Sequence, residues 1–423
     1  MLILGVVVTA ILFVIGAPIY IAFALGGVII LLLFAGFPLP ELAVFYFDTI
    51  DSFILLAGAL FVLAGNLMVR GGMGEPLVKF LSSFTARVPG GLAVATIIVC
   101  TFLGALTGSV VATLAAAGII MFPAMIAANY DRGYSTGVLC TGSTLGTLIP
   151  PSVTLILFGF LTQTSVGQLF MAGVVPGLLL AVLLAITAMV IARRKRFPLT
   201  PGVSWRERGN LFIKALPGIF MPVIVLGGIY GGVFTPTEAA AVACVYCILV
   251  GIFIYRGLNW KNFWTSVKDT VGVVGLILML IAGGMFLGKG FMLAGFPEAI
   301  CSWVVTTGLS PLMFLFLLTL AYIGLGFVMD ANAIMFVFIP LILPAAIALD
   351  INLIHLGIIF LFGVLVGGIT PPVAVLLYLT SGMFETPVED VMKGVIPFLA
   401  VMVIVMIIIT LFPEISLLLP GTM

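Results

Sequence analysis

The sequence predicts an all-α polytopic membrane protein. Of its 423 residues, 63% are hydrophobic and only 7% are charged, whereas soluble globular proteins carry about 25% charged residues. Apolar runs of roughly 17–25 residues, the length that crosses a bilayer as a helix, recur along the whole chain. The first run, residues 1–36, lacks a basic amino-terminal region and a small-residue cleavage site, so we interpret it as mature protein and not as a signal peptide.

Proline, glycine and charged residues divide the chain into two similar series of segments. In the first half they predict spans at 1–16, 18–35, 51–70, 135–163 and 167–192, a surface stretch at 74–87 and a hairpin at 90–128. In the second half they predict spans at 216–232, 236–255, 268–288, 353–383 and 389–412, a surface stretch at 295–305 and a hairpin at 311–348. The spans at 135–163 and 353–383 are interrupted in the middle.

The basic residues test this arrangement, because cytoplasmic loops of membrane proteins are enriched in Lys and Arg. With alternating sides, all 16 basic residues except Lys289 fall on one face. The residues on that face are Arg70, Lys79, Arg87, Arg132, Arg193, Arg194, Lys195, Arg196, Arg206, Arg208, Lys214, Arg256, Lys261, Lys268 and Lys393. The distribution predicts that the loop at 193–196 is cytoplasmic and that both termini are outside.

An internal repeat relates the two halves. A shift of 221 residues aligns Gly74 with Gly295, Pro76 with Pro297, Pro123 with Pro344, Gly146 with Gly367, Pro150 with Pro371 and Pro176 with Pro397. Because each half crosses the membrane an odd number of times, the copies must be inverted. We expect a first repeat at 1–200, a cytoplasmic interface segment at 201–215 and a second repeat at 216–423. Inverted repeats are typical of alternating-access transporters, whose site lies at the repeat interface near mid-membrane.

The hairpin tips, at 104–113 and 324–333, are the first candidate site segments. Their arms are short, and the tips lack the prolines or charge clusters of a surface loop. We therefore expect one re-entrant hairpin per repeat, although two full spans would fit the alternation of sides equally well. The 221-residue shift pairs Ser109 with Asp330.

The interrupted spans, at 144–153 and 365–374, each contain tandem prolines. Proline removes a backbone donor and blocks helical hydrogen bonding, and unwound backbone at membrane depth lines a cavity or is buried in protein. The freed carbonyls, together with hydroxyl groups, suit a desolvated Na⁺. The candidate Na⁺ ligands are Thr107, Gly108, Ser109, Gly146, Thr147, Pro150, Gly326, Met329, Asp330, Gly367, Thr370 and Pro371.

Asp330 is the only acidic or basic residue between Glu298 and Asp350. An acid inside a membrane costs free energy unless it is paired or functional. Either a bound Na⁺ or a proton could neutralise it, and the alternative is a hairpin tip exposed to water in one state.

The second arm of each hairpin begins at the tip, so two helix N-termini point into the expected cavity. Their partial positive charge and free N–H groups favour a carboxylate. The candidate substrate site consists of Thr113, Ser152, Asn332 and Pro372, of which the first three could form hydrogen bonds with the substrate. We expect no Arg or Lys in this interior, which favours a monocarboxylate over a multiply charged anion.

Three further features have structural interpretations. Thr235-Pro236-Thr237-Glu238 is typical of a capped helix start. The cysteines at 100, 140, 244, 247 and 301 lie in apolar stretches and are expected to pack in the core, including the C-x-x-C pair. His355, the only histidine, is expected at a membrane interface, and the stretches 74–87 and 205–215 are expected to be surface helices. No basic cluster suits nucleic acid.

Several of these segments carry a family resemblance. The motifs are GALTGSVVATLAAAGIIMFPAM, GTLIPPSV, SVGQLFMAGVVPGLL, GGIYGGVFTPTEAAAVACVY, FVMDANAIMFVFIPLILP and GGITPPVAVLLY, and they span almost the whole chain. The sequence thereby resembles the large membrane (M) subunit of tripartite ATP-independent periplasmic (TRAP) transporters, at positions where we see no departure from the family pattern.

This resemblance implies an elevator-type, ion-transporter-like fold in the bacterial inner membrane, with both termini periplasmic, and Na⁺ as the coupling ion without an organic cofactor. It also implies two partners: a small four-helix membrane subunit, expected to be a separate chain, and a periplasmic substrate-binding protein. The expected cargo is an organic acid, either a sialic acid or similar sugar acid or a C4-dicarboxylate. A stand-alone Na⁺ or H⁺/dicarboxylate symporter remains the alternative, and an intramembrane enzyme is less favoured because Asp330 has no acidic partner within the membrane.

Overall fold

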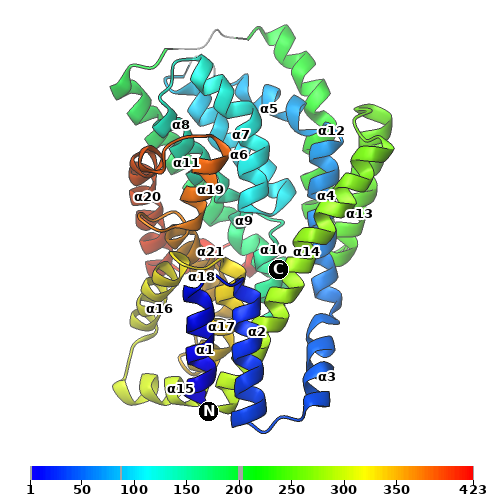
Figure 1. Ribbon diagram of the computed structural model, residues 1–423. Coiled ribbons are helices and arrows are strands. Elements are labelled where there is room, and N and C mark those ends of the chain that lie inside the picture. Colours follow the sequence, from blue (N-terminus) through cyan, green and yellow to red (C-terminus); the bar gives the residue numbers. More distant parts are fainter. Residues whose placement is uncertain (1, 86–87, 199–202, 423) are drawn as a thin grey trace.

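All regular secondary structure is helical within residues 2–85, 88–198 and 203–422, the part of the chain that the computed structural model describes (Figure 1). Arg87 and the expected boundary at residue 200 lie outside these described residues, so the structure says nothing about either.

The first half begins with two short helices and ends with a long one. Its elements are α1 (Leu2–Val14), α2 (Ile19–Ile29), the π-helix η1 (Ile30–Phe34), α3 (Leu39–Ile50), α4 (Phe53–Arg70), α5 (Gly74–Ser82), α6 (Gly91–Thr107), α7 (Val110–Ala127), α8 (Arg132–Ser143), α9 (Leu145–Leu148), α10 (Val153–Thr162) and α11 (Val166–Lys195). The helices α6 and α7 form the predicted hairpin, and α8 to α10 form the predicted interrupted span.

The second half follows nearly the same order. Its elements are α12 (Trp205–Tyr230), α13 (Pro236–Leu249), the π-helix η2 (Val250–Ile254), α14 (Trp260–Leu293), α15 (Phe296–Thr307), α16 (Pro311–Gly326), α17 (Ala331–Ala348), α18 (Leu353–Gly367), α19 (Val375–Met383), α20 (Val388–Leu411), α21 (Glu414–Leu417) and the 3-10 turn η3 (Pro420–Thr422). Each half has a π-helix after its second helix, and cis peptide bonds at Pro150-Pro151 and Pro371-Pro372.

Corresponding elements of the two halves lie at opposite ends of the molecule. Figure 1 shows α5 and the α6–α7 hairpin toward one end, and α15 and the α16–α17 hairpin toward the other. The hairpins therefore approach the middle from opposite directions, which is the arrangement that inverted repeats require.

Three predicted boundaries were wrong. The helix α14 (Trp260–Leu293) begins before and ends after the predicted span at 268–288. Residues 39–50 form the helix α3, which we did not predict because prolines at 38 and 40 and acids at 41 and 48 are typical of a loop; Pro40 is accommodated in the first turn, where its missing N–H costs nothing. Residues 205–215 do not form a separate interface helix. They continue without a break into α12, whose start is capped by the Ser204 hydroxyl, which accepts from the backbone N–H of Glu207.

Eight helices of the described chain are long and apolar enough to cross a membrane, or nine if the bent α8–α10 pair, with its 42° angle, counts as one span. This set includes the hairpin arms α7 and α17 and omits the short helices α1 and α18. The number of membrane crossings, ten in the sequence analysis with both hairpins re-entrant, therefore stays a prediction.

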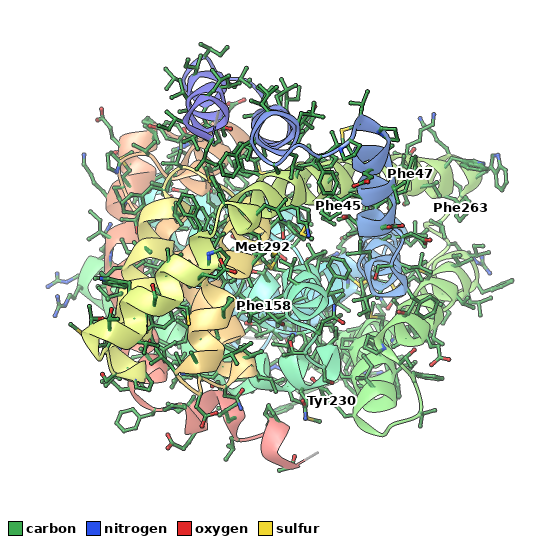
Figure 2. The ribbon with its side chains drawn as sticks, turned by 90° about the horizontal axis from the view of Figure 1, so that it is seen from below. Phe45, Phe47, Phe158, Tyr230, Phe263 and Met292 are labelled. Atoms are coloured by element: carbon green, nitrogen blue, oxygen red, sulfur yellow. The ribbon has the colours of Figure 1, made fainter. Side chains whose placement is uncertain are left out.

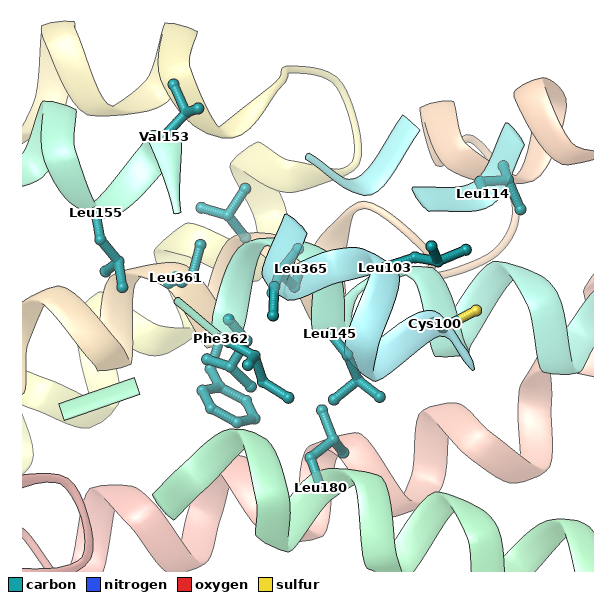
Figure 3. Packing of buried hydrophobic residues seen from close by; sticks show 14 of the residues in the cluster. Cys100, Leu103, Leu114, Leu145, Val153, Leu155, Leu180, Leu361, Phe362 and Leu365 are labelled. Atoms are coloured by element: carbon teal, nitrogen blue, oxygen red, sulfur yellow. The ribbon is translucent and has the colours of Figure 1, made fainter. Parts of the chain in front are cut away.

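The two halves share one apolar core. Phe158 of α10 stacks on Phe360 of α18 with ring centroids 6.1 Å apart, and Phe158 lies in the middle of the molecule whereas Phe47 and Phe263 lie near its edge (Figure 2). Figure 3 shows Leu103 and Leu145 of the first half grouped with Leu361, Phe362 and Leu365 of the second half. This packing joins the two broken spans to one another.

The predicted orientation can be tested by single cysteines at exposed positions at the two ends. We expect Arg206→Cys and Lys261→Cys to react with a membrane-impermeant maleimide only from the cytoplasmic side, and Glu298→Cys only from the outside, because the basic loops are predicted to be cytoplasmic. The unsubstituted chain is the control for the native cysteines. Reversed labelling of the 206 and 298 positions would refute the orientation.

Candidate functional site

The first hairpin tip packs directly on the first broken span. A Cβ added at Gly104 would lie 2.4 Å from the Cα atom of Gly146, so only two glycines allow this approach. Gly108, at the turn of the tip, has a φ of +61°, a conformation that glycine adopts without strain, and a Cβ there would lie 2.9 Å from the carbonyl oxygen of Pro151. The tip and the Pro-Pro turn are therefore held as one unit.

The second hairpin tip packs on the second broken span in the same way. A Cβ at Gly326 would lie 2.9 Å from the carbonyl oxygen of Val364 and 3.0 Å from the Cα of Gly367. The two Pro-Pro turns differ in their surroundings, because Pro150 and Pro151 are buried whereas Pro372 is exposed.

Both tips border one cavity of about 970 Å³. Its walls come from the tips, from α7 and α19, and from α4 and α14, which belong to neither hairpin. Most lining side chains are apolar, including Val62, Ala115, Leu276 and Leu379. The polar groups gather where the hairpin tips meet the broken spans and near the C-terminal end of α4, as is usual for ligand cavities, which place a few polar groups in an apolar wall.

Half of the predicted ligands line this cavity directly. They are Thr107, Gly108, Ser109, Thr147, Gly326, Met329 and Asp330 of the candidate ion site and Asn332 of the candidate substrate site. In the described chain, the remaining candidates are not among the lining residues: Thr113, Gly146, Pro150, Ser152, Gly367, Thr370, Pro371 and Pro372.

Several of those remaining candidates pack against the lining residues or cap the helices that carry the site. The Thr113 hydroxyl is buried and lies 2.8 Å from the Thr107 hydroxyl. Gly146 packs beside the carbonyl oxygen of Ser109, 3.0 Å from an added Cβ. Ser152 is fully buried and accepts a hydrogen bond from the backbone N–H of Leu155, so it caps α10.

Asp330 and Asn332 form the polar start of α17. Asp330 occupies the N-cap position, and its Oδ1 accepts a hydrogen bond of 3.0 Å from the backbone N–H of Asn332. The side chain of Asp330 is exposed and borders the cavity. The Oδ1 atom of Asn332 is buried and has no hydrogen-bond partner in the described chain, so a donor on a ligand could satisfy it.

Arg70, the last residue of α4, also lines the cavity. The expectation that no Arg or Lys faces the site was therefore wrong, and with it the reason for favouring a monocarboxylate. The sequence places Arg70 before a Gly-Gly turn, which is typical of a loop residue, and only the packing of α4 on α14 brings it to the cavity wall.

The structure also bears on the other sequence interpretations. The capping box at Thr235 and Glu238 is confirmed, because the backbone N–H of Thr235 donates to Glu238 Oε2 at 2.8 Å and the Glu238 N–H donates to the Thr235 hydroxyl at 3.3 Å. His355, expected at a membrane interface, is 2% exposed, and its Nδ1 lies 2.7 Å from the Ser416 hydroxyl of α21; its depth in the membrane stays a prediction. Cys100, Cys140, Cys244 and Cys247 are buried, and Cys301 is half-buried.

The family model described as "Tripartite ATP-independent periplasmic transporter, DctM component" matches residues 6–415. The chain belongs to the DctM family. It is a large permease subunit of a TRAP transporter and a multi-pass membrane protein. The family consists of transporter permeases and not of enzymes.

Similar DctM-family proteins are named for different substrates. The chain is 38% identical to the C4-dicarboxylate TRAP transporter large permease protein DctM of Pseudomonas aeruginosa over 397 residues, which cover 94% of this chain and 93% of that protein. It is 31% identical to the sialic acid TRAP transporter large permease protein SiaM of Vibrio cholerae over 371 residues, which cover 88% and 87%.

A solved structure shares the fold of this DctM-family permease. The YdaH transporter of Alcanivorax borkumensis superposes with a TM-score of 0.59 at 13% sequence identity, covering 87% of this chain and 86% of that one. At this identity the likeness concerns the fold alone.

Proposed function

We propose that this permease carries out Na⁺-coupled uptake of an organic acid that a periplasmic substrate-binding protein delivers, by an elevator-type alternating-access mechanism. The observation that carries the proposal is the cavity bordered by two oppositely directed hairpin tips, one of which presents Asp330. TRAP transporters are secondary transporters, so an ion gradient must supply the energy. A carboxylate at a hairpin tip can bind the cation that flows down this gradient.

Na⁺ fits the groups at the tips. Hard cations prefer oxygen ligands, and the tips offer the Asp330 carboxylate, the Thr107 and Thr147 hydroxyl groups and the backbone carbonyls beside Gly108 and Gly326. The hydroxyl of Thr370 donates to the carbonyl oxygen of Val366 at 2.6 Å, which leaves its lone pairs free to coordinate. A proton on Asp330 in place of Na⁺ is the competing form of coupling.

The contacts favour an elevator. We propose two inverted repeats, of which the hairpins and broken spans form the moving part, because their close glycine contacts hold them together. The helices α4 and α14 would belong to the static frame, and the mainly apolar cavity separates part of this frame from the hairpin tips.

Two partners follow from the tripartite family: a periplasmic binding protein and a small membrane subunit. For the cargo, we propose an organic acid in the range of the relatives, a C4-dicarboxylate or a sugar acid such as sialic acid. The unpartnered Asn332 Oδ1 would accept a hydrogen bond from a hydroxyl or amide group of that cargo, and the N-terminus of α17 favours its carboxylate.

Uptake into liposomes tests the proposal. We expect accumulation of labelled succinate or sialic acid only when the permease is reconstituted with its small subunit, an inward Na⁺ gradient is present, and the matching binding protein is loaded. A Na⁺ ionophore and a K⁺ gradient of equal size are the controls. Rapid uptake of free substrate without Na⁺ or binding protein would refute the tripartite mechanism, and uptake with Na⁺ but without binding protein would indicate a stand-alone symporter.

A further inference from the structure

Only two charged side chains line the cavity within the described chain, and they have opposite signs. Asp330 borders it at the second hairpin tip, and Arg70 borders it at the C-terminal residue of α4. If the hairpin site holds a cation, an organic anion that passes through this cavity meets a single positive side chain. That side chain lies at the end of α4 next to α5, on the predicted cytoplasmic side.

Within the described residues, Arg70 pairs with one carboxylate, that of Asp269 of α14. The Nη2 atom of Arg70 donates to Oδ2 of Asp269. The two side chains are 38% and 45% exposed, so the pair is accessible to solvent. Because a guanidinium group has five N–H donors in a planar fork, a contact through one nitrogen leaves donors that can face the cavity.

The helices α4 and α14 do not depend on this ion pair for their contact. The amide Nδ2 of Asn66 donates to the Thr270 hydroxyl at 3.0 Å, and the Ser266 hydroxyl lies 3.4 Å from the carbonyl oxygen of Asn66. Thr270 and Ser266 are buried, whereas the Arg70–Asp269 pair is exposed. An exposed ion pair contributes little to stability, so its partner can be exchanged at little cost.

We propose that Arg70 is the anion-selecting residue of the cavity, and that Asp269 is the carboxylate that a substrate carboxylate displaces from it. The exchange replaces one guanidinium–carboxylate contact with another of the same chemistry, so it favours carboxylates and other oxyanions over cations without holding them tightly. The inference rests on the proposed function, since it names the class of substrate that leaves by this route, but its test requires no transport.

A cysteine inside the cavity reports the selectivity. Ile119 of α7 lines the same cavity and is 75% exposed, so Ile119→Cys is the reporter. In permeabilised membranes its rates of reaction are measured with the anionic reagent 2-sulfonatoethyl methanethiosulfonate and with its cationic trimethylammonium analogue. The ratio of the two rates cancels differences in accessibility, and the chain without the reporter gives the background.

We expect Arg70→Gln to lower the ratio of anionic to cationic labelling by roughly fivefold, Arg70→Lys to leave it within about twofold, and Asp269→Asn to raise it. Lys195→Gln is the matched control, because Lys195 also forms a long-range ion pair at the predicted cytoplasmic end, with Asp131, and is not among the residues that line the cavity in the described chain. It should leave the ratio unchanged.

An unchanged ratio in Arg70→Gln would overturn the proposal. Equal lowering by Arg70→Gln and Asp269→Asn would also overturn it, because that result assigns the pair to bracing α4 against α14. Absence of Na⁺-driven uptake in liposomes, with the expected labelling ratios, would refute the proposed function and leave the anion selectivity of Arg70 intact.

Discussion

Replacement of Asp330 with Asn is expected to lower Na⁺-dependent uptake at least roughly tenfold, since the loss of about 1.4 kcal/mol of ion binding already has that effect. The substitution separates the charge of Asp330 from its structural role. Asn is as good an N-cap as Asp, so the hydrogen bond from the Asn332 N–H that starts α17 is kept. The measurement is initial uptake against Na⁺ concentration, with the melting temperature as the check on folding.

Asp350→Asn is the matched acid-to-amide control. Asp350 is exposed in the turn between α17 and α18 and has a φ of +55°, which Asn tolerates as well as Asp. It should leave uptake and its Na⁺ dependence unchanged. If Asp330→Asn retains the Na⁺ dependence of the unsubstituted chain, Asp330 serves only as a helix cap at a tip exposed to water.

The second large effect is expected for Gly367→Ala in the broken span α18. The new Cβ would lie 2.4 Å from the carbonyl oxygen of Ile323, a backbone atom of the hairpin arm α16 that cannot rotate away. Overpacking of this kind costs about 1–3 kcal/mol, and the hairpin tip must shift from its place at the cavity. We therefore expect a lower melting temperature in detergent and loss of most uptake.

Gly382→Ala in α19 provides the control, because the structure has no atom within 4 Å of its added Cβ. Gly382 lies on the same broken span as Gly367, and both variants replace glycine with alanine. Equal behaviour of the two variants would show that close packing of the second tip on α18 is unimportant for the site.

The hairpins and the broken spans could be predicted from the sequence because proline and glycine act locally. The tandem prolines fix the breaks within the two broken spans, and the predicted hairpins at 90–128 and 311–348 agree closely with α6–α7 and α16–α17. By contrast, α3 was missed because its acids and prolines resemble a loop. The fusion of 205–215 with α12 was missed because an amphipathic stretch can either end at the membrane surface or continue into it.

The tips of the candidate site were also predictable, since Ser109 and Asp330 interrupt long apolar runs. Arg70 was not. Because it follows an apolar span, Arg70 has the sequence pattern of an ordinary cytoplasmic charge. Its place on the cavity wall depends on the packing of α4 against α14, whose Asp269 lies 199 residues after Arg70 in the chain. A contact between two helices so distant in sequence leaves no local pattern of residues.

The unbroken length of α14 has a consequence for the membrane around the protein. Its 34 residues extend about 51 Å at 1.5 Å per residue, well beyond a hydrocarbon core of about 30 Å, and in Figure 1 the helix runs obliquely across the molecule. The uncharged part of the helix, residues 270–288, is about 28 Å long, and such an apolar stretch tilts when the lipid layer becomes thinner than its own length. Because Val273, Leu276 and Leu280 of α14 line the cavity, we expect a change in the tilt of this helix to alter the width of the cavity.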